Sequence, residues 1–172
     1  MKYVKLDSNE LDIVGLNQLS SLIFTSNKSI MDLYKNIPET YKNLNEFMHN
    51  INFKNILKYI DKYDYKFIIS DNTNLSCIIG YMLAKVNKSN SNNISLTIND
   101  FYLNKYYQST GHMSILFDIV INDIKENYDS HLLYVNLYNK DILRIKFLLK
   151  HNFKQIGISN SIDNKMVYYK EI

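Results

Sequence analysis

The chain has 172 residues, of which 46% are hydrophobic, and its 20 basic and 17 acidic residues give a formal net charge of +3. This length and this hydrophobic content predict one globular domain over residues 1–172. The near balance of charge argues against nucleic acid as a partner. No apolar run reaches the roughly 18 residues that cross a membrane, and the N-terminus lacks a signal-peptide core, so we expect a soluble cytoplasmic protein.

Cys77 is the only cysteine, which excludes an intrachain disulfide and favours a reducing compartment. It lies in the apolar stretch Leu75-Ser-Cys-Ile-Ile-Gly80, where a core position is the more common role and a reactive thiolate is the alternative. The four histidines lack H-x-x-x-H spacing, and the sequence contains no CxxC. We therefore predict no metal site.

The N-terminal third is predicted to be one strand followed by helices. Residues 3–6 alternate as in a strand, and Asp7 with Glu10 forms the pattern of a capping box. The helix that follows is expected to end near residues 24–28, where polar residues cluster. Apolar residues recur at helical spacing from 29 to 62 and predict two or three further helices, interrupted at Pro38.

The pattern then changes to strands. Residues 65–70 and 75–86 are rich in isoleucine, tyrosine and phenylalanine, and the polar residues 71–74 between them predict a hairpin turn. The polar stretch 87–93 predicts a loop that leads to another strand.

This next strand, residues 94–103, has a break in its alternation. Its apolar residues occupy even positions up to Ile98 and odd positions from Phe101, with Asn99 and Asp100 between them. A β-bulge at Asn99-Asp100 would keep all of them on one face, would bend the strand and would leave backbone groups unpaired. The alternative is that one face of the strand changes its packing partner halfway.

The remaining elements complete a mixed fold. A helix is predicted over residues 113–124, a strand over 131–138, a helix over 142–150 capped by Asp141, and a closing hairpin from 153–159 and 165–170. The fold class is therefore α/β (mixed α+β), with a central mixed sheet of about seven strands flanked by helices.

One of the four glycines, Gly111, lies between the interrupted strand and the following helix. A glycine turn at a helix N-terminus can bring backbone N–H groups close to a phosphate, and Gln108, Ser109 and Thr110 could add polar donors. A plain helix-start turn is the alternative. A ligand with a pyrophosphate and an amide-bearing arm, such as coenzyme A, could bind both the turn and the opened strand.

The stretch Gln108-Ser-Thr-Gly111-His-Met113 resembles the R/Q-x-x-G-x-G/A loop of the GNAT superfamily of acetyl-CoA-dependent acyltransferases. Phe101-Tyr-Leu103 is similar to the family's bulged strand, and residues 133–137 and 141–153 are similar to its next strand and helix. The resemblance implies acetyl-CoA as cofactor, without a metal. It implies that the cofactor contacts Phe101, Tyr102, Leu103, Gln108, Ser109, Thr110, Gly111, His112, Met113 and Asp141.

Within that superfamily, Leu16-Asn-Gln-Leu-Ser-Ser-Leu-Ile-Phe24 and Lys165-Met-Val-Tyr-Tyr-Lys170 resemble the San or NatE type of N-terminal protein acetyltransferases. The resemblance implies that a protein or peptide N-terminus is the substrate, that Phe24, Tyr168 and Tyr169 contact it, and that an auxiliary protein subunit is a further candidate partner. Without the resemblance, the two tyrosines would be assigned to ordinary β packing.

The sequence also departs from the family's catalytic pattern. The family's catalytic tyrosine and histidine fall on Thr97 and Asn136, and the tyrosine that protonates the leaving thiolate falls on Leu148. Asn136 can orient a water molecule, and Tyr134 and Asp100 are the candidates for relaying a proton.

Three functions follow. The first is an acetyl-CoA-dependent N-acetyltransferase that acts on an amine, foremost the α-amino group of a protein or peptide. The second is a catalytically inactive protein of the same fold that binds coenzyme A or a partner, and the third is a small-molecule amine acetyltransferase, in which residues 29–62 close the acceptor groove.

Overall fold

The computed structural model of the chain describes residues 1–6, 11–50, 53–71, 77–88, 94–128, 132–158 and 165–172. Within them, one seven-stranded sheet has the order β1-β2-β3-β4-β5-β7-β6. Only the β4–β5 pair is parallel. The strands are β1 (Lys2–Lys5), β2 (Tyr65–Ser70), β3 (Ile78–Lys88), β4 (Ile94–Leu103), β5 (Leu132–Leu137), β6 (Lys154–Ile158) and β7 (Met166–Glu171). This arrangement confirms the predicted mixed sheet.

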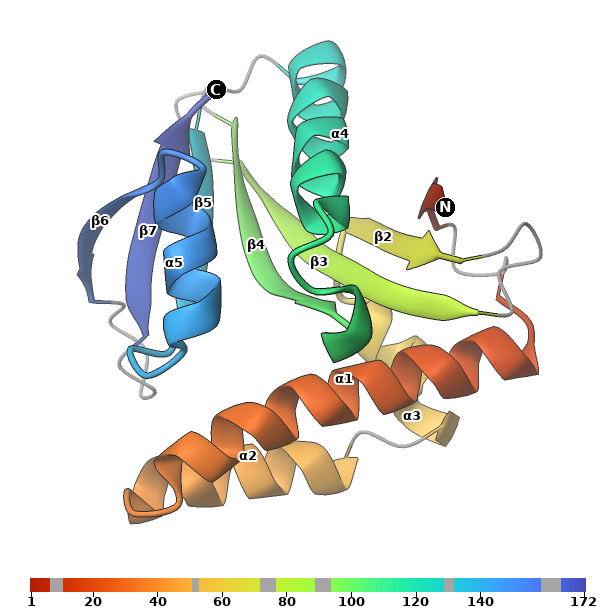
Figure 1. The fold of residues 1–172 in the computed structure, drawn as a ribbon, viewed down its shortest axis with the longest axis vertical. Coiled ribbons are helices and arrows are strands. Elements are labelled where there is room, and N and C mark those ends of the chain that lie inside the picture. The colour runs from red at the N-terminus through yellow and green to blue at the C-terminus, as the bar shows by residue number, and fades with distance from the viewer. Residues whose placement is uncertain (7–10, 51–52, 72–76, 89–93, 129–131, 159–164) are drawn as a thin grey trace.

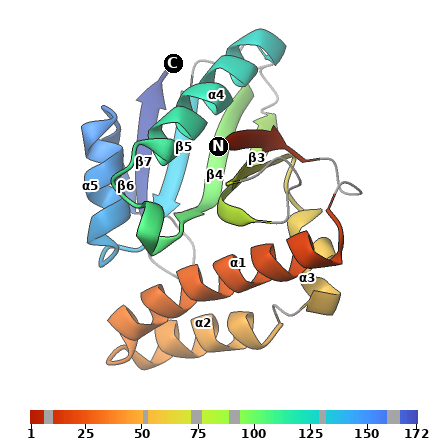
Figure 2. The ribbon, with the colours of Figure 1, turned by 45° about the vertical axis from the view of Figure 1, so that its right-hand side comes forward.

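Helices cover both faces of the sheet (Figures 1 and 2). They are α1 (Ile13–Tyr34), α2 (Pro38–Asn50), α3 (Phe53–Ile60), α4 (His112–Asn127) and α5 (Ile142–Lys150), with a 3-10 turn, η1 (Lys105–Tyr107), before α4. One core cluster joins α4 and α5 to one face of the sheet, and a second joins α1 and α3 to the opposite face. Helix α2 packs along α1.

The first helix begins and ends later than the sequence predicts. Its N-cap is Asp12, whose Oδ1 accepts a hydrogen bond of 2.8 Å from the Gly15 N–H. Asp7 and Glu10, the predicted capping pair, lie outside the described residues. Asp12 accepts from a free N–H of the first turn, and so it has the capping role that the sequence pattern assigned to Asp7.

The predicted end of this helix at residues 24–28 was wrong, because α1 continues to Tyr34. The polar side chains there bond to the helix itself: Thr25 Oγ1 donates to the Ser21 carbonyl at 2.8 Å, and Ser29 Oγ donates to the Ser26 carbonyl at 2.6 Å. These bonds to the preceding turn let hydroxyl residues continue a helix that packing already favours.

The predicted bulge in β4 is confirmed. Leu83 of β3 faces Asp100 and its neighbour Ala84 faces Ile98, so that Asn99 is an extra residue on β4. Ile98 and Phe101, which have opposite parity, are both buried in the core beneath α4 and α5. The strand therefore keeps one face, and the alternative of a change in packing partner does not hold.

The bulge is also where β4 leaves β5. The parallel pairing runs from Ser95 with Leu132 to Ile98 with Val135. Beyond it β4 continues to Leu103 while paired only with β3. In Figure 1 the β4 ribbon bends away from β5 toward its lower end, above α1. Peptide groups on one edge of β4 thus lose their strand partner there.

Most of the other predicted elements are also confirmed. Helix α2 begins at Pro38, β2 and β3 form an antiparallel hairpin, and Asp141 caps α5. Most of the turn at 71–74 and of the loop at 87–93 lies outside the described residues. Among the helices that the structure describes, none is long and apolar enough to cross a membrane.

Gly80 of β3 allows a test of how tightly β3 packs against β4. A Cβ at this position would lie 2.9 Å from Leu103 Cδ1 and 3.0 Å from the Tyr102 carbonyl oxygen. Because the backbone oxygen cannot easily move, Gly80→Ala should lower the free energy of unfolding by about 1–3 kcal/mol in urea denaturation. The control is Gly157→Ala in β6, where a Cβ would meet nothing within 4 Å. Equal stability of the two variants would contradict the prediction.

Candidate functional site

The turn between β4 and α4 contains the glycine that the sequence singles out. Gly111 has φ +86°, a left-handed conformation that suits glycine, and it is the N-cap of α4. A Cβ built on it would meet nothing within 4 Å, so the conformation and not the space requires glycine there. The first N–H groups of α4 lack partners within the helix and face this open position.

The side chains before Gly111 hold the turn in shape. Gln108 Nε2 donates to the Leu103 carbonyl oxygen at 3.0 Å, and the Thr110 hydroxyl donates to the Tyr107 carbonyl oxygen. Ser109 has φ +65°, a second left-handed residue in the turn. The side chains of Gln108 and Thr110, and their backbone N–H groups, therefore bond within the turn, which leaves the first N–H groups of α4 as donors to a ligand.

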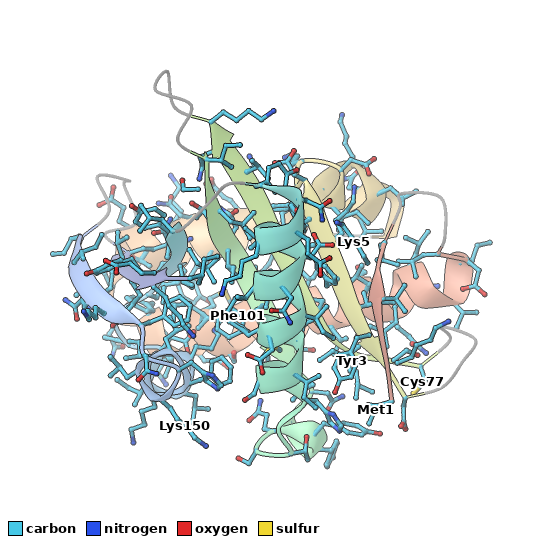
Figure 3. All side chains as sticks on the ribbon, turned by 90° about the horizontal axis from the view of Figure 1, so that it is seen from above. Met1, Tyr3, Lys5, Cys77, Phe101 and Lys150 are labelled. Carbon is cyan, nitrogen blue, oxygen red and sulfur yellow. The ribbon has the colours of Figure 1, made fainter. Side chains whose placement is uncertain are left out.

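The two residues after Gly111 point in different directions. Met113, which takes the place of a small residue in the resemblance, is 7% exposed and belongs to the core beneath α4. Its bulk therefore lies away from the glycine turn. His112 Nδ1 shares a hydrogen bond of 2.8 Å with the hydroxyl of Tyr3 in β1. Figure 3 shows Tyr3 beside α4.

A charge network lies at the bulge, and its charged side chains are between 8% and 16% exposed. Arg144 of α5 donates from Nη1 to Asp100 Oδ1 at 2.9 Å and to the Phe101 carbonyl oxygen at 3.0 Å. Its Nε donates to Asp141 Oδ2. The second oxygen of Asp100 accepts from the Tyr81 hydroxyl at 2.7 Å. Asp100 thus has both oxygens engaged, and Arg144 links α5 to the part of β4 that has left β5.

This network fixes the protonation of Arg144 and Tyr81. Burial disfavours the charge of Arg144, but the carboxylates of Asp100 and Asp141 outweigh it and raise the arginine pKa above its ordinary value. Burial, and next the charge of Asp100, raise the pKa of Tyr81 well above that of a free tyrosine. Arg144 therefore stays charged, and Tyr81 stays a hydrogen-bond donor.

A cavity of about 220 Å³ adjoins this network on the α1 side of the sheet. Its walls come from α1, α2, the end of α3, the bulge, the end of β5 and the start of α5. The lining residues are Asn27, Ile30, Asn43, Leu44, Tyr59, Tyr63, Asn99, Asp100, Asn136, Leu137, Tyr138, Arg144 and Lys165. Burial raises the pKa of both Tyr59 and Tyr63, so their hydroxyls stay protonated, and the Tyr63 hydroxyl donates to the Tyr59 oxygen at 3.1 Å.

The predicted catalytic residues are only partly brought together. Asp100 and Asn136 both line the cavity, whereas Tyr134 does not. Tyr134 shares the Asn136 face of β5 and lies opposite Tyr169 of β7. Tyr134 therefore lies on the same face of the sheet as Asn136 but outside the cavity wall.

The predicted peptide-site residues lie apart from one another. Tyr168 is 2% exposed within the core beneath α4 and α5, whereas Tyr169 points to the opposite face with Tyr134. Phe24 is 41% exposed on α1. None of the three lines the cavity formed by the described residues.

Other predicted cofactor residues follow the two faces of β4. Phe101 and Leu103 are buried toward α4, and Figure 3 places Phe101 next to that helix. Tyr102 packs into the cluster on the α1 side. Asp141 is 6% exposed and holds the Arg144 guanidinium as well as capping α5.

Sequence reasoning missed Arg144, and it expected residues 29–62 to shape the acceptor groove without naming the side chains that α1–α3 contribute to the cavity. One signal was available for Arg144, since it is the only arginine among 20 basic residues. An arginine that is not replaced by lysine in such a chain suggests a need for its forked donor geometry. The asparagines and tyrosines of the cavity gave no comparable signal, because both residue types are abundant throughout the chain.

Comparisons with known proteins support this geometry at the level of the fold. No family model and no curated protein sequence matches the chain. Among solved structures, the PaiA N-acetyltransferase from Thermoplasma acidophilum in complex with coenzyme A matches with a TM-score of 0.69 and 14% identity over 100% of both chains. The chain has the GNAT fold.

Other GNAT structures are similar too. Naa50 from Arabidopsis thaliana, bound to the bisubstrate analogue CoA-Ac-MVNAL, has a TM-score of 0.53 and 15% identity over 72% of this chain and 96% of its own. Aminoglycoside 6'-acetyltransferase type Ii has a TM-score of 0.65 and 13% identity over 99% and 97%. These GNAT proteins differ in acceptor, so the likeness does not single out the N-terminal type.

No group of residues suited to a metal ion occurs in the described part of the chain.

The Tyr81–Asp100 bond is open to a direct test. Tyr81→Phe should lower the free energy of unfolding by about 1–3 kcal/mol, because one buried oxygen of Asp100 loses its donor. Urea denaturation at pH 7 measures the loss. Tyr102→Phe is the control, since this ring packs 6.5 Å from that of Tyr81 and the same atom is removed. A loss no larger than that of the control would show that the bond contributes little.

Proposed function

We propose that the chain is an acetyl-CoA-dependent N-acetyltransferase that transfers the acetyl group directly to an amine. One observation carries this proposal: β4 gains the extra residue Asn99, loses β5 beyond Ile98 and leads into a left-handed glycine turn that opens α4. A free strand edge and an anion-binding turn on one short segment suit the two halves of coenzyme A.

The residues present fit the cofactor. The position beside Gly111 is open, and the first-turn N–H groups of α4 would hold the pyrophosphate, with Ser109 and His112 at its sides. The backbone of Phe101–Leu103 would hold the amide-bearing arm. Asp141 bonds to Arg144 and so lies near the same strand edge. When bound, acetyl-CoA supplies an activated thioester at the bulge.

The acceptor amine would enter the cavity on the α1 side. There, Asn136 of the cavity wall would orient the amine or a water molecule. Asp100 also lines the cavity, but its two oxygens accept from Arg144 and Tyr81, and Tyr134 lies outside the wall. Asn136 is therefore the predicted catalytic residue best placed at the amine. The amine nitrogen forms the C–N bond with the acetyl carbon, the C–S bond breaks, and the proton lost by the nitrogen balances the thiolate. Alignment of the two reactants contributes several kcal/mol to such a transfer, even where the base is weak.

Two acceptor classes follow. The sequence resemblance favours the α-amino group of a protein or peptide, with an auxiliary subunit as a further partner. Of the contacts it implies, Phe24 is exposed, whereas Tyr168 is buried on the face opposite to Tyr169 and cannot reach a peptide there. The cavity favours a small polar amine, because Asn43 of α2 and Tyr59 of α3 contribute to its walls. Its tyrosine and asparagine lining suits hydroxyl and amide groups on such a molecule.

A second candidate function is a GNAT protein that binds coenzyme A or a partner without catalysis. Leu148 takes the place of the family's acid, and its side chain is fully buried. The hydroxyl of Thr97, in place of the family's tyrosine, accepts a hydrogen bond of 2.7 Å from Asn87 Nδ2. Neither residue supplies a proton donor comparable to a tyrosine at the cavity.

A product assay separates these candidates. The protein is incubated with acetyl-CoA and either a library of peptides with free N-termini or a panel of small amines, and mass spectrometry follows a gain of one acetyl group. We expect acetylated product from one acceptor class, together with free thiol in equal amount. Binding of coenzyme A in calorimetry without any product would favour the inactive candidate, and absence of both would contradict the proposed fold-based function.

The glycine turn provides a second test. Gly111→Ala places a Cβ on a residue with φ +86°, which costs about 1 kcal/mol and distorts the turn. We expect the Kd for coenzyme A in calorimetry to rise about tenfold, since the N–H groups no longer converge on the pyrophosphate. Gly157→Ala, away from the turn, should leave the Kd unchanged. An unaltered Kd in Gly111→Ala would place the pyrophosphate elsewhere.

A further inference from the structure

The free edge of β4 is already occupied by a side chain. Beyond the bulge, the Phe101 carbonyl accepts a hydrogen bond from Arg144 of α5. The Asn104 N–H bonds to Ile79 of β3, so alternation along the strand turns the Phe101 carbonyl to the opposite edge, which pairs with β5 before the bulge. The same Nη1 atom reaches Asp100, and the guanidinium carbon lies 5.6 Å from the Phe101 ring centre. The guanidinium thus covers the backbone at the point where β5 no longer does.

We propose that Arg144 is a specificity-determining gate on this edge, which must leave Phe101 before an amide-bearing ligand can lie along β4. This proposal rests on the proposed function, since coenzyme A is the ligand in question. A guanidinium and a ligand amide cannot both occupy the strand edge beside one peptide group. A ligand must therefore gain enough binding free energy to displace the guanidinium, and ligands that bind weakly do not.

The surroundings allow the guanidinium to move while it keeps one of its two charge partners, Asp141. Arg144 lines the cavity of about 220 Å³, which offers room beside the strand edge. Asp141 is on the same helix three residues before it and can keep its bond to Nε during the movement. Release of Phe101 then breaks the two Nη1 bonds, to the Phe101 carbonyl and to Asp100, and Asp100 keeps its hydrogen bond from the Tyr81 hydroxyl. A buried charge that retains a partner avoids the larger cost of an unpaired one.

The gate and a purely structural role predict opposite results. If Arg144 only holds the fold, its removal loosens β4 and weakens coenzyme A binding. If Arg144 occupies the ligand's place, its removal frees the edge and strengthens binding. The sign of the change in affinity therefore decides between them, and it requires no turnover by the enzyme.

The test is calorimetric titration of coenzyme A into the full chain and into the double variant Arg144→Gln with Asp141→Asn. The pair removes one charge of each sign, and asparagine remains a good helix N-cap. We expect the Kd to fall about tenfold.

Arg144→Lys keeps a positive charge but loses the forked donors of the guanidinium, and it should lower the Kd by less than tenfold. This variant also replaces the double variant if that protein does not fold. Lys146→Gln, an exposed position on the same helix, is the control for loss of charge and should bind like the parent.

Three outcomes are distinguishable. Tighter binding by the Arg144 variants supports the gate, including the case in which the parent chain does not bind and only the variants do. Equal or weaker binding by the variants, with the parent binding normally, overturns the gate and leaves the proposed function intact. No binding by the parent or by any variant overturns both the gate and the assignment of coenzyme A.

Discussion

One extra residue, Asn99 in β4, is the constraint on which the rest of the site depends. The buried apolar residues of β4 have even numbers before Asn99 and odd numbers after it, and both groups pack into the core beneath α4 and α5. A regular strand would place Phe101 and Leu103 in the wrong layer. The insertion keeps them buried, and the bend that accompanies it separates β4 from β5. The opened strand edge is thus a consequence of packing the core, before any ligand is considered.

The bulge also brings a charge into the interior. Because Asn99 shifts the alternation, Asp100 turns to the α1 face, where it meets Tyr81 and Arg144. A carboxylate in that position needs compensation, and a lysine would supply a single point charge. Arginine can bond to two carboxylates and a carbonyl at once, which explains why the only arginine of the chain lies here. The electrostatics of the site follow from the geometry of one strand.

The sequence predicted those features that local patterns control. Alternation specified the strands, the change of parity located the bulge, and Asp141 marked the start of α5. The end of α1 was misplaced, because hydroxyl residues at 25–29 bond to their own helix and local propensity cannot show which partner they choose. Arg144 was missed for a different reason: its partner Asp100 is 44 residues away, and their meeting depends on where α5 packs. The opposite faces of Tyr168 and Tyr169, by contrast, follow from strand geometry alone.

The cavity is assembled from parts of the chain that are far apart in sequence. Its floor belongs to α1–α3, and its far wall to β5 and the start of α5. These parts are tied together where the Tyr34 hydroxyl at the end of α1 bonds to Asn139 and to the Lys140 N–H. The glycine turn and the free edge of β4 do not involve Tyr34, Asn139 or Lys140. Changes in α2 and α3 can therefore reshape the cavity while the turn and the edge stay unchanged. Asn99, Asp100 and Arg144 belong to both regions, so a substitution at any of them affects the strand edge and the cavity together.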